Sequence, residues 1–335
     1  MRESSAGAWR TPYVPSIPRG RLWAAFLALA VAAAYAALGF STVLADFGGD
    51  AAAYWLTAQG WSPWFASTPL QREFAAASTY PPLYPLVLAW LGASQTLLAA
   101  HLATVGLLLG GMVALGWFCR RAGLDGLAST GVVLTYACCA TVRYEGLDLH
   151  SEPLYLLLSM LALVVGCSLE NSRARRAPTE RTVGAAHGRE SIHPTRPTRL
   201  ALLLGVLMAG ALLTRSAGVT LLVALLATGL RRREGVWFVA LLPGLGALGV
   251  NTWLQGSAQR YSGEFIGQWA LSGLAEKALQ QLHALATGWT VAVAGQGAPI
   301  ALLWVLGFCG LVVIAAGLYR AWQGHFDGFY SLAYL

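Results

Sequence analysis

LALLLGVLMAGALLTRSAGVTLLVALLATGL, residues 200–230, is a run of 31 almost continuously apolar residues with arginines on both sides. A single helix of this length would reach about 46 Å, well beyond a hydrocarbon core of roughly 30 Å. It would also carry Arg231–Arg233 across the membrane, although basic segments tend to stay in the cytoplasm. The run therefore predicts two short helices, about 200–213 and 216–230, with a turn at Thr214-Arg215-Ser216 and both basic flanks inside.

The rest of the chain has the composition of a polytopic membrane protein. Hydrophobic residues make up 56% of the 335 residues and charged residues 11%, which is too apolar for a soluble domain of this size. The net charge of +7 comes from short basic segments that alternate with apolar runs, which is the positive-inside pattern. The five cysteines have no metal-ligand spacing and are interpreted as small buried hydrophobes. We therefore expect the membrane as the environment and no nucleic-acid partner.

The apolar runs predict an all-α fold, a helical bundle with about eight transmembrane helices. The predicted spans are 22–44, 94–119, 127–142, 153–168, 200–213, 216–230, 236–253 and 299–319. A shorter, Pro-rich segment at 80–92 is predicted to be an interfacial or partly inserted helix. Residues 1–21 form a polar, basic tail, expected to be cytoplasmic and disordered, and residues 22–335 form one transmembrane domain.

Three long loops join these spans. Loops 45–80 and 254–298 fall outside the cytoplasm under this topology, and the Arg-rich loop 169–199 falls inside it without predicted structure. The last residues, Gly328–Leu335, resemble the opening of another span, so the sequence predicts a chain that is incomplete at its C-terminus. We expect an integral membrane protein with a cytoplasmic N-terminus and an extracytoplasmic functional face.

Acidic residues gather at the predicted outer face, where an arginine approaches them from within the bundle. Asp46 and Asp50 lie in the first outer loop, and Glu152 lies in the second. Arg215 would be recessed, because each arm of the 200–230 run reaches only about 21–24 Å. A carboxylate can take a proton from an attacking hydroxyl or amine, and a guanidinium can hold a leaving phosphate with two parallel hydrogen bonds. This pattern suits transfer of a group that is carried on a lipid phosphate.

Each of these residues also has a purely structural interpretation. Asp50 precedes AAAYWLTAQ and could be the N-cap of a helix, and Tyr54, four residues on, could pack or touch a substrate. Asp46 could be a solvated loop acid. Glu152 could be a first-turn residue favoured by the helix dipole, and Arg215 could snorkel to the interface.

Two histidines give weaker signals. His101 lies within a predicted span and suits a hydrogen bond between helices better than a ligand role. His150 is close in sequence to Asp148 and Glu152, so a metal site at the outer face stays open. No second spacing motif supports such a site, and no residue is assigned as a metal ligand.

Four segments carry a family resemblance when they are taken in order. They are GGDAAAY at 48–54, YPPLYPLVLAWLG at 80–92, SEPLYLLLSMLAL at 151–163 and LLTRSAGVTLLVALLATGLRRR at 212–233. The ordered set, which covers about 40–335, resembles the GT-C membrane glycosyltransferases. It is most similar to the branch related to protein O-mannosyltransferases and lipid A aminoarabinose transferases. Many relatives carry an adjacent Asp-Glu pair in the first outer loop, whereas Asp50 here is followed by Ala51.

This resemblance implies an inverting glycosyltransferase that moves a sugar from a polyprenyl-phosphate donor to an acceptor at the outer face. In that family an acid of the first outer loop is the catalytic base, and this role maps onto Asp50. The donor phosphate would bind Arg215, with Arg143 or Arg260 as further candidates. The candidate substrate-binding residues together are Asp46, Tyr54, Arg143, Glu152, Arg215 and Arg260. The sequence specifies neither the sugar, nor the acceptor, nor a divalent-metal requirement.

Two other classes of protein remain as alternatives. A multi-pass transporter or lipid flippase would favour ionisable residues within the spans and broken helices at the midplane. Here the acids lie in predicted outer loops and only His101 lies deep in a span, so the transferase is favoured. A non-catalytic membrane subunit is the second alternative.

Overall fold

The computed structural model describes residues 19–40, 43, 49–174, 196–254, 312, 315–328 and 330. All the regular structure within these residues is helical, as the sequence predicts. The helices are α1 (Arg19–Leu38), α2 (Asp50–Trp61), α3 (Pro69–Ala77), α4 (Leu83–Trp90), α5 (Leu97–Arg121), α6 (Gly126–Cys138), α7 (Ala140–Leu147), α8 (Glu152–Ala174), α9 (Arg196–Thr214), α10 (Val219–Arg232) and α11 (Gly235–Leu254). Two 3₁₀ turns lie at Ala93–Gln95 and Ser216–Gly218, and further helical segments lie at 315–322 and 326–328.

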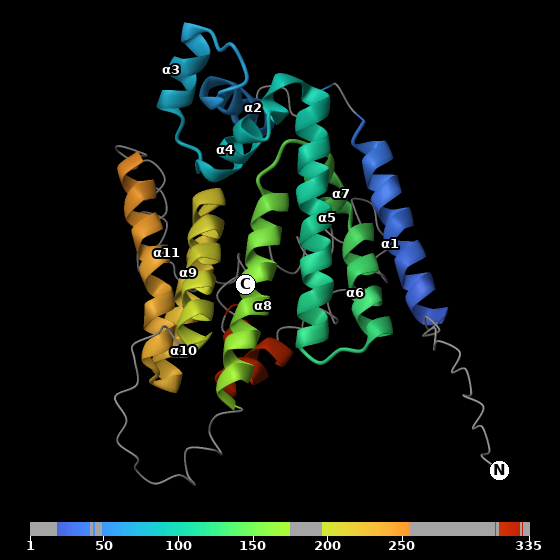
Figure 1. Ribbon diagram of the computed structural model, residues 1–335, viewed down its shortest axis with the longest axis vertical. Helices are drawn as coiled ribbons and strands as arrows, with labels where there is room; N and C mark the ends of the chain where they lie inside the picture. The colour runs from blue at the N-terminus through green and yellow to red at the C-terminus, as the bar shows by residue number, and fades with distance from the viewer. Residues whose placement is uncertain are drawn as a thin grey trace, which may run out of the picture.

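Helices α5, α8, α9 and α11 run side by side through the bundle, and the short helices α2, α3 and α4 cover one end of it (Figure 1). The largest core cluster joins α8, α9, α10 and α11. Its fully buried members include Leu204, Met208, Leu225 and Trp237. Helices α1 and α6 pack against α5 around Tyr35 and Met112. The apolar runs of the sequence therefore supply the core as well as the outer surface of the bundle.

Three described helices are long and apolar enough to cross a membrane. They are Leu97–Arg121, Glu152–Ser172 and Pro197–Thr214. Shorter apolar helices are Ala28–Leu38, Gly126–Cys138 and Gly235–Asn251. The structure thus agrees with residence in a membrane, whereas the number of about eight spans and the orientation stay predictions.

The 200–230 run folds as two helices, and the predicted turn is confirmed. Helix α9 ends at Thr214, a 3₁₀ turn follows, and α10 begins at Val219. Arg215 pairs with Glu152 at the start of α8, and Arg232 pairs with Glu170 near the end of α8 at 3.1 Å. Because these two pairs lie at opposite ends of α8, α10 carries its basic end back to the side from which α9 comes.

The predicted single span at 127–142 is wrong, because the chain breaks at Cys139. Helix α6 ends at Cys138, Cys139 is extended (φ −62°, ψ 131°), and α7 starts anew at Ala140. The hydroxyl of Tyr35 donates to the carbonyl of Ala137 at 2.6 Å. In a continuous helix that carbonyl would accept from an N–H four residues on, so the contact with α1 satisfies a group that the break leaves free.

Several predicted boundaries are also corrected. The outer loop predicted at 45–80 contains α2 and α3, and α1 ends at Leu38 rather than at residue 44. The cytoplasmic loop predicted at 169–199 is shorter, because α8 runs on to Ala174 and α9 starts at Arg196. Helices can extend past the hydrocarbon core into the headgroup region, so apolar length alone underestimates them. The predictions for the tail up to residue 18, for 175–195 and for 255–311 lie outside the described residues.

Helix α3 within that predicted loop has a local cause in the sequence. The hydroxyl of Thr68 accepts from the N–H of Gln71 at 3.3 Å, and the Gln71 side chain accepts from the N–H of Thr68 at 2.8 Å. This capping box is followed by Pro69 at the first helical position, where its missing N–H costs nothing.

The close approach of α9 and α11 depends on a glycine. A Cβ at Gly205 would lie 2.4 Å from the carbonyl oxygen of Ala240 and 2.8 Å from Cγ of Pro243. We therefore expect Gly205→Ala to lower the free energy of unfolding by about 1–3 kcal/mol through overpacking. The measurement is a thermal unfolding midpoint of the detergent-solubilised chain.

Gly106→Ala on α5 is the matched control for this prediction. A Cβ there meets nothing within 4 Å, and alanine favours a helix over glycine by up to about 1 kcal/mol. Its midpoint should be unchanged or higher. If both variants shift in the same direction by the same amount, the packing argument for Gly205 fails.

Candidate functional site

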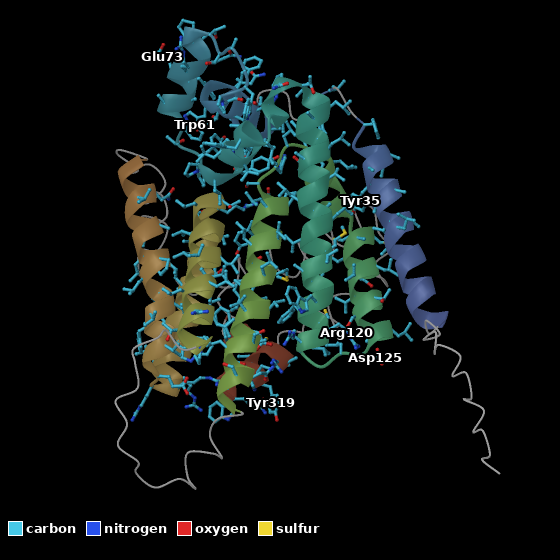
Figure 2. All side chains as sticks on the ribbon, viewed as in Figure 1. Tyr35, Trp61, Glu73, Arg120, Asp125 and Tyr319 are labelled. Atoms are coloured by element: carbon cyan, nitrogen blue, oxygen red, sulfur yellow. The ribbon has the colours of Figure 1, made fainter. Side chains whose placement is uncertain are left out.

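The short helices at one end of the bundle position the first candidate residue, Asp50. Figure 2 labels Trp61 and Glu73 in these helices, at the opposite end from Arg120 and Asp125. The Gln71 side chain donates to that of Gln59 at 2.8 Å, which ties α3 to α2. Helices α2, α3 and α4, called the cap below, are thus held together by side-chain contacts. Asp50 is the first residue of α2, the first helix of the cap.

Asp50 is not the N-cap of α2, so that structural interpretation is wrong. Gly49 takes the N-cap position with an extended backbone, and no side chain caps the helix there. The carboxylate of Asp50 is exposed and accepts a hydrogen bond from the hydroxyl of Tyr80 at 2.7 Å. Since a carboxylate can accept several hydrogen bonds, this one orients Asp50 and leaves it capacity to take a proton from a substrate.

Tyr54 connects the helix of Asp50 to the start of α8. It is buried, and its ring makes edge contacts with Tyr80 and Tyr84 at centroid distances of 5.1 Å each. Its hydroxyl donates to Oγ of Ser151 at 3.2 Å. Tyr84 in turn shares a hydrogen bond of 2.7 Å with Thr104 on α5. The tyrosines therefore fix the cap to the bundle directly beside Asp50.

Glu152 and Arg215 form an ion pair between α8 and the turn after α9. Glu152 is the acidic residue in the first turn of α8, so its expected helix-dipole position is confirmed. Their side chains are 32% and 39% exposed, so the pair lies at a surface that a ligand can reach. A guanidinium has five N–H donors, and one carboxylate leaves some of them for a phosphate.

Asp148 and His150 lie next to this pair, in the short turn before α8. Asp148 is 1% exposed, its Oδ1 accepts from the N–H of Leu149 at 2.8 Å, and its Oδ2 lies 3.7 Å from Nε2 of His150. Nδ1 of His150 lies 3.8 Å from Glu152. Burial acts to raise the pKa of Asp148, but these contacts and the charge of nearby His101 outweigh it and hold the pKa below its ordinary value.

This lowered pKa predicts a pH-dependent contribution of Asp148 to stability. Because the folded pKa is depressed, the ionised carboxylate stabilises the fold above the ordinary value, and this contribution is lost as the pH falls through the folded pKa. We expect Asp148→Asn to cost about 1–3 kcal/mol at pH 7. The difference in unfolding free energy between the two proteins should shrink as the pH falls below about 4. If the difference in unfolding free energy does not change with pH, the charge of Asp148 does not stabilise the fold.

The metal site left open at the outer face gains no support. Among the described residues no three His, Cys, Asp or Glu side chains are arranged to hold a metal ion. His101 acts as expected for a residue that joins helices, because its Nδ1–H donates to the carbonyl of Leu147 on α7 at 2.7 Å.

A cavity of about 370 Å³ opens beside the Glu152–Arg215 pair. The pair supplies its charged groups, and the remaining walls are largely apolar, with Leu108 of α5, Val142 of α7 and Leu156 and Met160 of α8 among them. Tyr155 and Tyr330 also line it, and their hydroxyls lie 3.3 Å apart. The cavity thus offers an arginine and a largely apolar surface to one ligand.

Of the three remaining predicted site residues, Arg143 alone lies within the described part of the chain. Arg143 lies on α7 and is exposed, and within the described chain neither an ion pair nor a hydrogen bond joins it to Asp50, Glu152 or Arg215. Its predicted place in an outer loop is therefore wrong, because Arg143 lies within α7, whereas its role as a phosphate ligand stays a prediction. Asp46 and Arg260 lie outside the described residues.

The structure adds Tyr80 and Ser151, which lie in two of the segments that carry the family resemblance but were not predicted as site residues. The signal available was their position, since Tyr80 opens the YPPLYP segment and Ser151 directly precedes Glu152. No protein-family model, curated protein or solved structure matches the chain. The function is therefore argued from the residues of the site and their geometry.

Proposed function

We propose that this protein is a membrane glycosyltransferase that moves a sugar from a polyprenyl-phosphate donor to an acceptor hydroxyl or amine. The observation that carries the proposal is the continuous set of contacts from Asp50 through Tyr80, Tyr54 and Ser151 to the segment that begins α8. It brings an exposed carboxylate and an ion-paired arginine to the same end of the bundle. The family resemblance of the sequence supports the same assignment.

In the proposed reaction Asp50 is the general base. Its carboxylate takes the proton of the acceptor as the acceptor oxygen or nitrogen attacks the anomeric carbon of the sugar. The bond between that carbon and the phosphate oxygen breaks, and the polyprenyl phosphate leaves with the bonding electron pair. Because attack comes from the face opposite the leaving phosphate, the configuration at the anomeric carbon is inverted.

Arg215 is the proposed ligand of the donor phosphate. Negative charge grows on the phosphate as the bond to the sugar breaks, and a guanidinium that is already in place stabilises it without reorganisation. The carboxylate of Glu152 holds the guanidinium at the cavity, so Glu152 is a positioning residue. The largely apolar walls of the 370 Å³ cavity suit the first isoprene units of the donor lipid.

Tyr80 and Tyr54 are also positioning residues in this proposal. Tyr80 orients the carboxylate of Asp50, and Tyr54 packs between Tyr80 and Tyr84. The hydrogen bond of Tyr54 to Ser151 keeps the cap in register with α8. Such supporting contacts matter because a misplacement of about 1 Å can cost about 100-fold in rate.

The proposal is tested by sugar transfer in membranes that contain the full chain. Radiolabelled polyprenyl-phosphate sugars are supplied, and label is followed into water-soluble, lipid and protein fractions. Transfer that depends on the chain supports the proposal, and the labelled fraction identifies the acceptor class. Saturable movement of intact donor across vesicles, with no covalent product, would instead establish the transporter or flippase.

A further inference from the structure

A second cavity, of about 400 Å³, lies between α1, α5 and α6, away from the candidate site. Its walls are mostly apolar side chains, with the hydroxyl groups of Ser129 and Thr130 on α6 among them. They include Ala28 and Ala32 of α1, Met112 and Gly116 of α5, and Val133 of α6, with Arg120 at one end. Nothing in the proposed transfer reaction uses this groove, so its combination of an apolar trough and a cation needs its own explanation.

Measured along α5, the length of the groove matches the thickness of one membrane leaflet. Leu109 and Arg120 both line it on α5, and eleven residues of helix rise about 16 Å. This is roughly half of a hydrocarbon core of about 30 Å. One acyl chain of a single leaflet fits this length, whereas a lipid chain that spans both leaflets is too long for it.

Among the described side chains of α1, room for such a chain lies away from its C-terminal end. Near its C-terminal end it is in close contact with α5, since a Cβ at Gly39 would lie 2.8 Å from Cγ2 of Val105. Towards the Arg120 end α1 diverges from α5 (Figure 1), and Ala28 and Ala32 become walls of the groove. The groove therefore opens towards the membrane surface where Arg120 lies.

Arg120 supplies the charge at that surface. One of its N–H groups donates to the carbonyl of Leu124 at 3.0 Å, and within the described chain neither Arg120 nor Arg121 pairs with a carboxylate. The nearby acid, Asp125, is engaged at the start of α6, where its Oδ1 accepts from the N–H of Ala128 at 2.7 Å. Figure 2 places Arg120 and Asp125 at the same end of the bundle. The guanidinium thus keeps donors for an anion at the mouth of the groove.

We propose that this groove binds one anionic phospholipid from the leaflet at the Arg120 end, with an acyl chain between α1, α5 and α6 and the phosphate on Arg120. The charge bias of the sequence predicts that this leaflet is the cytoplasmic one, whose surface is negative. Basic pockets between transmembrane helices on that side bind anionic headgroups. A zwitterionic lipid could fill the same apolar trough but would gain less from the arginine.

The test measures lipid retained by the purified full chain. The chain is incubated in mixed micelles with equal amounts of phosphatidylglycerol and phosphatidylcholine of identical acyl chains, repurified, and analysed by native mass spectrometry. We expect one phosphatidylglycerol per chain in preference to phosphatidylcholine. Arg120→Gln should lower its retention about fivefold with little effect on phosphatidylcholine. Ala32→Trp should fill the groove and remove the bound phosphatidylglycerol.

Arg121→Gln is the matched control, because it removes the same charge from the adjacent residue, whose guanidinium lies over Trp117 at 6.0 Å. The Arg121→Gln variant should retain as much phosphatidylglycerol as the wild type. Equal loss in Arg120→Gln and Arg121→Gln would overturn the site, since it would show only a diffuse surface charge. Retention unchanged in both groove variants, with their unfolding midpoints intact, would overturn it too. A chain dimer that Ala32→Trp abolishes, without any bound lipid, would assign the groove to a second copy instead.

Discussion

Asp50→Asn is expected to lower the rate of sugar transfer by about 10²–10⁴-fold, the usual contribution of a general base. The amide has the shape of the carboxylate but cannot take the proton of the acceptor. Its oxygen can still accept the hydrogen bond from Tyr80, so the cap should keep its structure. The measurement is the initial rate with radiolabelled donor in membranes that contain matched amounts of the chain.

Glu73→Gln is the matched control for this variant. Glu73 is an exposed carboxylate on α3, in the same cap but outside the set of contacts around Asp50. Its rate should be that of the wild type. Full turnover by Asp50→Asn would exclude Asp50 as the base. Loss of turnover by both variants would show that activity depends on the overall negative charge of the cap rather than on Asp50 itself.

Arg215→Gln is expected to lower kcat/KM for the donor by about 100-fold or more, as for loss of a single group that stabilises charge in a transition state. Glutamine has neither the charge nor the paired donors that a phosphate accepts from a guanidinium. It also removes the guanidinium from Glu152, although that carboxylate is 32% exposed and lies 3.8 Å from Nδ1 of His150. Arg215→Lys should restore only part of the activity, because an ammonium is a point charge without the planar fork.

The control for Arg215 is Arg143→Gln, which removes an equal charge from an exposed position on α7. Activity should stay at the wild-type level, since Arg143 is not joined to the described site. A loss with Arg143→Gln as large as with Arg215→Gln would mean that both arginines bind the donor, and that α7 moves towards the cavity during the reaction. Wild-type kinetics for Arg215→Gln would show that the donor phosphate does not bind Arg215.

The sequence predicted which residues belong to the candidate site, but it did not predict the contacts between them. Asp50, Tyr54, Glu152 and Arg215 were each identified from charge, spacing and resemblance, and the structure brings all four to one end of the bundle. Arg143 was misplaced because the sequence between the predicted third and fourth spans was taken as a loop. Its helix, α7, has no strong apolar period and forms in the tertiary context.

The sequence by itself determined that the long apolar runs are helical and that the 200–230 run must turn. Apolar length against membrane thickness, together with the positions of arginines, is a local property, and it sufficed for the turn at Thr214-Arg215-Ser216. Only the tertiary structure decided the partners of Asp50 and Tyr54 and the break at Cys139. These depend on hydrogen bonds between residues 30, 97 and 102 positions apart. The energy of such contacts comes from how helices pack, and no local window of sequence contains both partners.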